Sequence, residues 1–202
     1  MCAKFSANGS EHLRIVRLFQ KGVLTMRTVP VFLASSTVEF RHERKELSVF
    51  VGRLNQAYFP RGIRVELTVC EDLSNAVERG RKQDKYNALI RTSRHFILLV
   101  GEEAGDFTLE EFNTALVSYR AGGTPRLHLF CREPLEGRGL TDSVRALLSR
   151  LEAERLPCVC FSDMKRVMIV LAEALCQDPL IGGDVNKADG FLVVDGKKVL
   201  AI

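Results

Sequence analysis

The 202-residue sequence has no tryptophan, no long apolar run and no block of like charge. No stretch approaches the roughly 18 consecutive apolar residues of a membrane-spanning helix, and no signal-peptide core is present. We therefore expect a soluble, cytoplasmic chain with no membrane partner. The formal net charge is +4, and the charged residues are interspersed rather than gathered in a basic arm. We therefore also expect no nucleic-acid partner.

The cysteines do not form a recognisable metal or redox motif, because none of the six belongs to a CxxC pair. The four histidines are scattered, so neither residue type has the ligand spacing of a zinc site. We expect no bound metal and no disulfide, and we interpret the cysteines as small buried side chains in a reducing compartment. They are Cys2, Cys70, Cys131, Cys158, Cys160 and Cys176.

Several common catalytic and nucleotide-binding motifs are also missing. The sequence contains no GxGxxG and no GxxxxGKS/T pattern, so neither the Rossmann nor the P-loop mode of phosphate binding is supported. No Ser/His/Asp set and no nucleophile elbow is evident. These absences exclude several hydrolase and oxidoreductase classes, but they leave the electrostatic use of a carboxylate open.

Strand and helix patterns alternate five times along the chain. Each predicted strand is short, and an apolar stripe with helical spacing follows each one. Parallel strands joined by right-handed helical crossovers are the economical solution to such an alternation. The predicted strands are 29–34, 63–69, 96–100, 127–131 and 158–161.

The second predicted strand, 63–69, alternates polar and apolar residues, which indicates a sheet edge with one face in water. An edge position for this strand gives the order 2-1-3-4-5, a flavodoxin-like, doubly wound α/β fold with a five-stranded parallel sheet. We assign 27–178 to this domain and 1–26 to an N-terminal extension. The remaining segment, 179–202, is predicted to form a linker and a β-hairpin that turns at Asp195-Gly196 in a type I′ turn.

The segment 96–120 carries the strongest candidate site. Its strand has no polar residue, so it should be buried on both faces, and an acidic loop follows it. A helix is predicted to begin at Thr108. In open α/β sheets ligands bind beyond the carboxyl ends of the strands, so the start of this helix should face a cleft. The apolar stripe of the helix consists of Phe112, Ala115, Leu116 and Tyr119.

Glu111 has two interpretations from spacing alone. Thr108 and Glu111 fit a capping box, in which the glutamate side chain bonds back to the N-cap amide. Alternatively, Glu111 is a carboxylate at the cleft that stabilises positive charge or acts as a general base. The spacing by itself favours the capping role.

Polar residues also follow the first two predicted strands, and each group has two interpretations. Hydroxyl and amide groups after the first strand suit a phosphate or a ribose, but they also suit a helix cap. Carboxylates after the second strand suit sugar hydroxyls, or they cap the helix predicted over 74–92. These candidates are Ala34, Ser35, Ser36, Glu71 and Asp72.

Two polar stretches are interpreted as solvated helix faces. The first is the mixed-charge run 41–46, and the second is a stripe in the helix 74–92 that includes Tyr86 and Asn87. Neither stretch has the single sign of charge that marks a polyanion-binding surface.

Taken together, several segments resemble bacterial TIR-like (Toll/interleukin receptor) domains, in particular the variant at the N-terminus of multidomain defence proteins. The resemblance covers about residues 29–177 and implies the same flavodoxin-like fold that the strand order predicts independently. The matching segments are VFLASS with Glu43-Arg44 after it, CED after the second strand, RKQDKYNALI, HFILLVGE and FTLEEFNTAL.

The resemblance implies an activity. Many TIR domains cleave NAD+ at the nicotinamide–ribose bond or cyclise the ADP-ribose product. Their catalytic glutamate is followed by an apolar residue, two further residues and a small residue; residues 111–115 (EFNTA) match this pattern, whereas Glu110 does not. The resemblance therefore implies that Glu111 is catalytic, that NAD+ is a substrate and that no cofactor is needed.

Substrate contacts are expected from the strand-end residues named above, with Tyr86 and Phe107 as the nearby aromatic candidates beside nicotinamide. The resemblance further implies homo-oligomerisation through TIR–TIR contacts, a role in antiphage defence or signalling, and a sensor domain fused beyond residue 202. Two alternatives remain open: a non-catalytic TIR scaffold that acts by homotypic association, and an N-glycosidic enzyme similar to nucleoside deoxyribosyltransferases.

Overall fold

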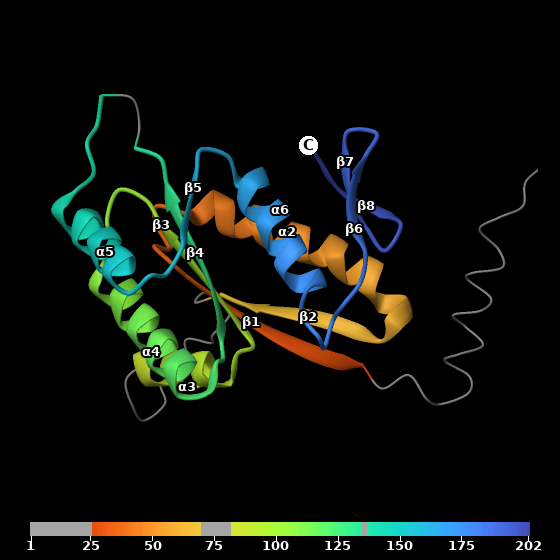
Figure 1. Cartoon of the computed structure of the whole chain (residues 1–202), viewed down its shortest axis with the longest axis horizontal. Coiled ribbons are helices and arrows are strands. Elements are labelled where there is room, and N and C mark those ends of the chain that lie inside the picture. The colour runs from red at the N-terminus through yellow and green to blue at the C-terminus, as the bar shows by residue number, and fades with distance from the viewer. Residues whose placement is uncertain (1–25, 70–81, 135–136) are drawn as a thin grey trace, which may run out of the picture.

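A computed structural model describes residues 26–69, 82–134 and 137–202, and it contains a central parallel sheet flanked by helices (Figure 1). The strands of this sheet are β1 (Arg27–Ser35), β2 (Ile63–Thr68), β3 (His95–Val100), β4 (Arg126–Arg132) and β5 (Cys158–Phe161). The helices are α2 (Arg41–Tyr58), the 3-10 turn η1 (Phe59–Arg61), α3 (Lys82–Thr92), α4 (Asp106–Gly122), α5 (Asp142–Ala153) and α6 (Met164–Cys176).

The sheet has the order β2-β1-β3-β4-β5, and all four pairings are parallel. This confirms the predicted flavodoxin-like order and the edge position of the second strand. The chain leaves β1 toward β2 on one side and later returns to β3 on the other. The order therefore reverses between β1 and β3, which is where open α/β sheets form a crevice.

Each face of the sheet has its own apolar core. The helices α2 and α6 cover one face, and α3, α4 and α5 cover the other (Figure 1). Alternate residues of β1 divide between the two cores: Val31 and Leu33 face α2 and α6, while Phe32 and Ala34 face the other layer. Every residue of β3 is buried, as predicted from its unbroken apolar run.

The predicted start of α4 is wrong. The helix begins at Asp106 with Gly105 as its N-cap residue, so Thr108 lies inside the first turn and cannot be the N-cap. Gly105 adopts an extended backbone, and the acidic Asp106 in the first turn favours this earlier start through the helix dipole. The capping box with Glu111 is therefore excluded. Tyr119 also departs from the predicted buried stripe, because 39% of it is exposed.

The C-terminal segment forms three antiparallel strands rather than a two-stranded hairpin. These are β6 (Val185–Ala188), β7 (Phe191–Val194) and β8 (Lys197–Ala201), in the order β6-β7-β8. The sequence pattern missed β6 because most of its residues are polar or small and exposed. The predicted turn between β7 and β8 is confirmed: Asp195 and Gly196 have φ values of 48° and 76°, as a type I′ turn requires.

This small sheet packs on the main domain beside α2 (Figure 1). Leu192, Val194 and Val199 join the same apolar core as α2 and α6. At the rim, Arg61 Nη1 lies 2.9 Å from Asp195 Oδ2. The hairpin therefore shares a core with the domain, which an isolated hairpin needs for stability.

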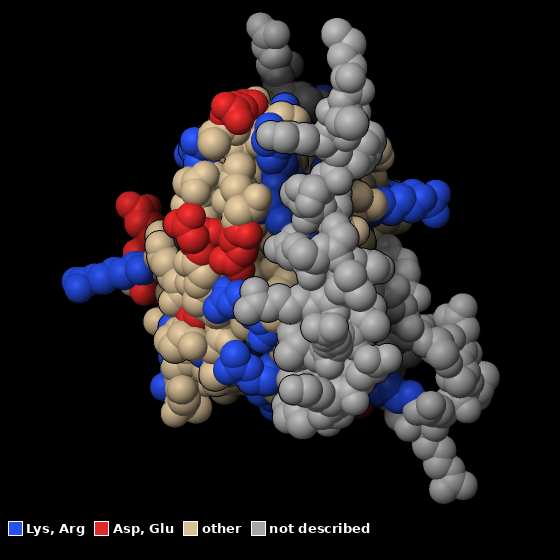
Figure 2. Space-filling model, turned by 90° about the vertical axis from the view of Figure 1, so that its right-hand side faces the viewer, with Lys and Arg blue, Asp and Glu red and all other residues tan. Residues whose placement is uncertain are grey.

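Charged side chains of both signs lie intermixed on the face shown in Figure 2. None of the helices among the described residues is both long enough and apolar enough to cross a bilayer. All four described cysteines are free thiols. Cys131 and Cys176 are buried, as expected. Cys160, which was expected to be buried, is exposed on the edge strand β5.

At the amino ends of β3 and β4, a buried polar cluster surrounds Asp178, which follows α6. Arg94 Nε donates to both carboxylate oxygens of Asp178 at 2.8 Å, and His95 Nε2 lies 3.1 Å from Oδ2. His95 Nδ1 is 2.9 Å from Nε2 of His128. The Arg126 guanidinium completes the cluster, with Nε 3.7 Å from Asp178. This cluster fastens the end of α6 to the sheet.

Burial shifts the pKa values in this cluster. It lowers the pKa of His95 and of His128 to about 4, against 6.5 for an exposed histidine. Burial alone would raise the pKa of Asp178, but hydrogen bonds from Arg94 and from the Leu180 amide lower it below its usual value. At neutral pH the two histidines are therefore neutral and the carboxylate is charged.

We predict that the fold loses stability as the pH falls from about 6.5 to 4. In this window unfolded histidines bind protons that the folded pair does not, so the free energy of unfolding decreases with decreasing pH. One histidine shifted to this extent accounts for up to about 3 kcal/mol. Urea unfolding of His128→Gln should show a smaller loss across this window, whereas His42→Gln, at a side chain 81% exposed, should match the parent. An unchanged pH slope in His128→Gln would contradict the assignment.

Candidate functional site: a two-part cleft at the carboxyl edge of the sheet

The crevice between β1 and β3 is a cavity of about 490 Å³ at the carboxyl edge of the sheet. One wall comes from the segment after β1, and the other comes from the loop after β3 and the first turn of α4. We call this cavity the switch-point pocket. Its lining residues are Ser36, Val38, Glu39, Glu102, Glu103, Gly105, Thr108 and Thr141.

Glu111 lies one helical turn beyond Thr108, on the same face of α4. Its exposed fraction is 3%, and Thr108, which lines the switch-point pocket, is 8% exposed. Glu111 is therefore a buried residue of α4, in the same helix as Phe112 and Ala115, which pack on the sheet face of Phe32 and Ala34. Glu110, by contrast, accepts a hydrogen bond from Asn87 Nδ2 at 2.9 Å and so points toward α3.

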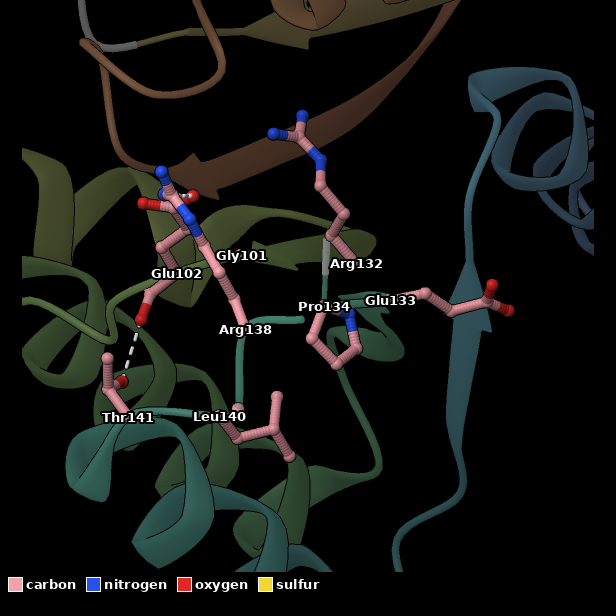
Figure 3. A pocket seen from close by; sticks show the side chains of 9 residues that line it. Gly101, Glu102, Arg132, Glu133, Pro134, Arg138, Leu140 and Thr141 are labelled. Carbon is pink, nitrogen blue, oxygen red and sulfur yellow. Dashed lines mark hydrogen bonds and ion pairs between the residues drawn. The ribbon is translucent and has the colours of Figure 1, made fainter. Parts of the chain in front are cut away.

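A second cavity of about 400 Å³ adjoins the first and shares Glu102 and Thr141 with it. We call it the β4 pocket, because the segment after β4 supplies most of its lining (Figure 3). Arg138 Nη1 donates to Glu102 Oε1 at 2.9 Å, and the Thr141 hydroxyl donates to the Glu102 carbonyl at 2.7 Å. The lining residues are Gly101, Glu102, Arg132, Glu133, Pro134, Arg138, Gly139, Leu140 and Thr141.

Both cavities fall in the size range of small-molecule sites. Among the described residues, the lining of the switch-point pocket includes the carboxylates Glu39, Glu102 and Glu103 and no lysine or arginine, so this part of the lining favours a ligand group that carries positive charge. The described lining of the β4 pocket includes Arg132 and Arg138. The cleft therefore has an acidic part and a mixed-charge part, which suits an extended, dipolar ligand.

Two of the predicted serines have structural partners. Ser35 is buried on the α2 face, and its hydroxyl accepts a hydrogen bond from Arg44 Nη1 at 2.8 Å. The Ser36 hydroxyl accepts from the Glu39 amide at 3.2 Å, in the turn before α2; Ser36 does not cap that helix, because its N-cap residue is Phe40. Ser36 also lines the switch-point pocket.

Arg44 was missed by the sequence analysis, because the run 41–46 was interpreted as solvated. The exposed fraction of Arg44 is only 3%. Its guanidinium donates to both the hydroxyl and the carbonyl oxygen of Ser35, at 2.8 and 3.3 Å. The helical spacing offered a signal: Arg44 precedes Leu47 and Val51 by three and seven positions, on the buried face of α2.

The remaining predicted contacts are dispersed. Ala34 is fully buried in β1. The Tyr86 ring is half-buried and packs edge-on against Phe32, with the ring centroids 6.4 Å apart. Phe107, in the first turn of α4, is 68% exposed and does not line either cavity. Glu71 and Asp72 lie outside the described residues.

Thiol and metal chemistry have little support near the cleft. Burial raises the pKa of Cys131, which precedes Arg132, and burial raises the pKa of Cys158 to about 12. Both are therefore protonated at neutral pH and are poor nucleophiles. Within the described ranges, no group of three or more His, Cys, Asp or Glu side chains is arranged to hold a metal ion.

The fold and the cleft together define an α/β protein of flavodoxin-like strand order with an acidic site at the topological switch point. No protein-family model and no curated protein sequence matches the chain. Among solved structures, the CMP N-glycosidase BcmB of Clostridium botulinum aligns with 70% of this chain and 97% of its own, at 16% identity and a TM-score of 0.42. The RPS4 and RRS1 TIR domain heterodimer aligns with 73% of this chain and 97% of the other, at 15% identity and a TM-score of 0.41. At these values neither similarity bears on the activity of this chain.

We predict that Ser35→Ala destabilises the protein by about 1–2 kcal/mol, because hydrogen bonds to charged groups are worth more than neutral ones. The variant removes the 2.8 Å acceptor of a buried guanidinium. Thr37→Ala, which removes an exposed hydroxyl two residues later, should change stability by less than about 0.5 kcal/mol. Urea unfolding at neutral pH measures both variants, and equal losses would show that the Ser35 contact contributes nothing specific.

Proposed function

We propose that this chain is a TIR-like NAD+ glycohydrolase, which breaks the nicotinamide–ribose bond and releases linear or cyclic ADP-ribose. Glu111 is the proposed catalytic carboxylate. The observation that carries the proposal is the burial of the Glu111 carboxylate on α4, one turn beyond Thr108, which lines the switch-point pocket. Burial of a carboxylate is costly, and such groups gather at catalytic sites. The match of residues 111–115 to the TIR pattern supports the same residue.

The chemistry suits an acidic pocket without a metal or a thiol. Cleavage of the glycosidic bond moves the bonding pair to the nicotinamide nitrogen, which leaves as neutral nicotinamide, and positive charge develops on the ribosyl carbon. A carboxylate near the ribose stabilises that charge, and this stabilisation is stronger in the transition state than in the substrate. Water then adds to the ribosyl carbon and loses a proton, giving ADP-ribose; attack by an adenine nitrogen gives the cyclic product instead.

Assembly belongs to the proposal as well. The aromatic side chains predicted to contact nicotinamide do not line the pocket of the single chain: Tyr86 packs against Phe32, and Phe107 is exposed. Val38, at the pocket rim, is 86% exposed. A second copy of the chain, seated over this rim, would exclude water from the pocket and cover both exposed apolar side chains.

We predict that Glu111→Gln lowers the rate of NAD+ cleavage by at least about 100-fold, because loss of a transition-state electrostatic contact has that scale. Glu110→Gln is the matched control, since a glutamine oxygen can still accept the Asn87 hydrogen bond, and it should retain most activity. Nicotinamide release measured by chromatography, with thermal unfolding to confirm folding, decides the result. Parental activity in Glu111→Gln would remove the main support for the enzyme.

A parent that consumes no NAD+ but cleaves deoxynucleosides would favour the deoxyribosyltransferase alternative, and a parent that only associates would favour the scaffold.

We also predict that the specific rate of NAD+ cleavage rises with protein concentration, because the described residues that line the pocket include no aromatic side chain. The dilute chain should be nearly inactive, and a crowding agent or fusion to an oligomer-forming domain should raise the rate. Val38→Asp, which places charge at the exposed rim, should weaken this dependence. An equal specific rate across a wide dilution series would show that one chain suffices.

A further inference from the structure

The two pockets of the cleft meet at a partition that joins three different loops. The partition consists of Glu39, from the segment after β1, Glu102, from the loop after β3, and Arg132, at the end of β4. Glu39 lines the switch-point pocket, Arg132 lines the β4 pocket, and Glu102 lines both. Any ligand that occupies both pockets therefore passes over this partition.

Gly101 makes the partition possible. A Cβ atom at this position would lie 1.7 Å from Glu39 Oε1 and 3.0 Å from Phe40 Cζ, so the Glu39 carboxylate occupies the space of the missing side chain. From there Glu39 Oε1 accepts a hydrogen bond from the Glu102 amide at 2.8 Å. Glu102 is the second residue after β3, so its amide lies beyond the hydrogen-bonded ladder of the sheet and needs another acceptor. Gly101 has no left-handed backbone angle, so what matters here is the close approach of Glu39: a Cβ atom at this position would displace the Glu39 carboxylate.

The same oxygen of Glu39 also lies near a cation. Arg132 Nη1 lies 3.7 Å from Glu39 Oε1, and Arg132 Nη2 makes an ion pair with Glu43 of α2. The Arg132 guanidinium lies over the Phe40 ring, 4.3 Å from its centroid. In Figure 3 the Arg132 side chain accordingly extends away from Pro134. The carboxylate is thus fixed between a backbone amide and an anchored cation, and it ties together the two walls of the switch-point pocket.

We propose that Glu39 is a positioning residue for the substrate of this cleft, acting through the backbone of Gly101 and Glu102. It holds the segment 36–39 and the loop 101–105 at the separation that binds the substrate across both pockets. The proposal rests on the proposed function for the identity of that substrate, a dinucleotide. Glu111 is buried on α4, whereas Glu39 and Gly101 lie outside that helix, so we expect its position not to depend on this contact. Loss of the Glu39 contact should therefore weaken substrate binding and leave the chemical step largely intact.

The test is a double-mutant cycle in the full chain under assembling conditions. Glu39→Ala and Gly101→Ala both break the contact, and each should raise KM for NAD+ by at least about tenfold with kcat reduced less than about threefold. The double variant should have nearly the same KM as the single variant that binds more weakly, because both changes remove the same interaction. Glu39→Gln keeps an oxygen acceptor for the Glu102 amide but removes the charge of a pocket-lining side chain, so it should raise KM clearly less than Glu39→Ala does. Gly52→Ala is the matched control for Gly101→Ala, since nothing lies within 4 Å of a Cβ at Gly52.

A second readout does not depend on activity. Hydrogen exchange of the Glu102 amide, followed by NMR in the ligand-free chain, should be at least about tenfold faster in Glu39→Ala than in the parent, and close to the parent in Glu39→Gln. A lower kcat with unchanged KM in Glu39→Ala would assign a merely structural role and overturn the proposal, as would independent, additive effects of the two alanine variants. If Gly101→Ala fails to fold, Glu39→Ala and Glu39→Gln still decide it.

The proposal and the hydrolase assignment can fail separately. If the parent binds ADP-ribose by calorimetry but does not cleave NAD+, the hydrolase assignment fails, and the Kd of ADP-ribose in the same variants decides the positioning role. If the parent cleaves NAD+ and Glu39→Ala has the parental KM, the positioning role fails and the hydrolase stands. A parent that neither binds nor cleaves overturns both.

Discussion

The constraint that organises this molecule is that β3 must be covered on both faces. All six of its residues are buried, so helices have to pack on both sides of the sheet. Right-handed crossovers meet this requirement only if the chain winds outward in two directions from the middle of the sheet. The chain moves from β1 to β2 on one side and from β3 to β4 on the other. The connections therefore diverge at the β1–β3 boundary, and the crevice is a consequence of core packing rather than an addition to it.

The same constraint explains where polar groups collect. Strand ends at the crevice leave amides and carbonyls without sheet partners, and side chains from different loops must satisfy them. Glu39 accepts the Glu102 amide, and Thr141 donates to the Glu102 carbonyl. The acidic character of the pocket thus has a partly structural origin. A carboxylate recruited to satisfy the backbone also presents negative charge to any ligand that enters.

The sequence predicted the strand order, the edge strand and the type I′ turn correctly, because each depends on a local pattern or on one short-range rule. It failed where local rules competed. Thr108 and Glu111 have the spacing of a capping box, but Gly105 and Asp106 start the helix earlier. The strand β6 could not be predicted from its own sequence, because most of its residues are polar or small. It forms by pairing with β7.

The sequence predicts where the cleft lies but not which side chains meet in it. The fold class implies that ligand-binding residues follow the strands and that the first turns of α4 are important. Long-range contacts do not, since Glu39 and Glu102 are 63 residues apart and neither belongs to a recognisable motif. Nothing in the local sequence distinguishes Gly101 from other loop glycines, although the Glu39 carboxylate lies where its Cβ atom would be. Arg44 lies in a mixed-charge run, which is typical of a solvated helix face. Its position on the buried face of α2 nevertheless decides its burial.

The two edges of the sheet differ in a way that bears on where function resides. At the amino edge, Asp178 is fully buried and is contacted by Arg94, His95 and the Leu180 amide, so its bonding capacity is used within the chain. At the carboxyl edge, two adjoining cavities open beside carboxylates and guanidinium groups that remain partly accessible to solvent. Charged groups that are already enclosed and paired stabilise a fold, whereas charged groups lining a cavity can exchange water for a ligand. Within one molecule, this contrast favours the carboxyl edge over the amino edge as the place where a ligand binds.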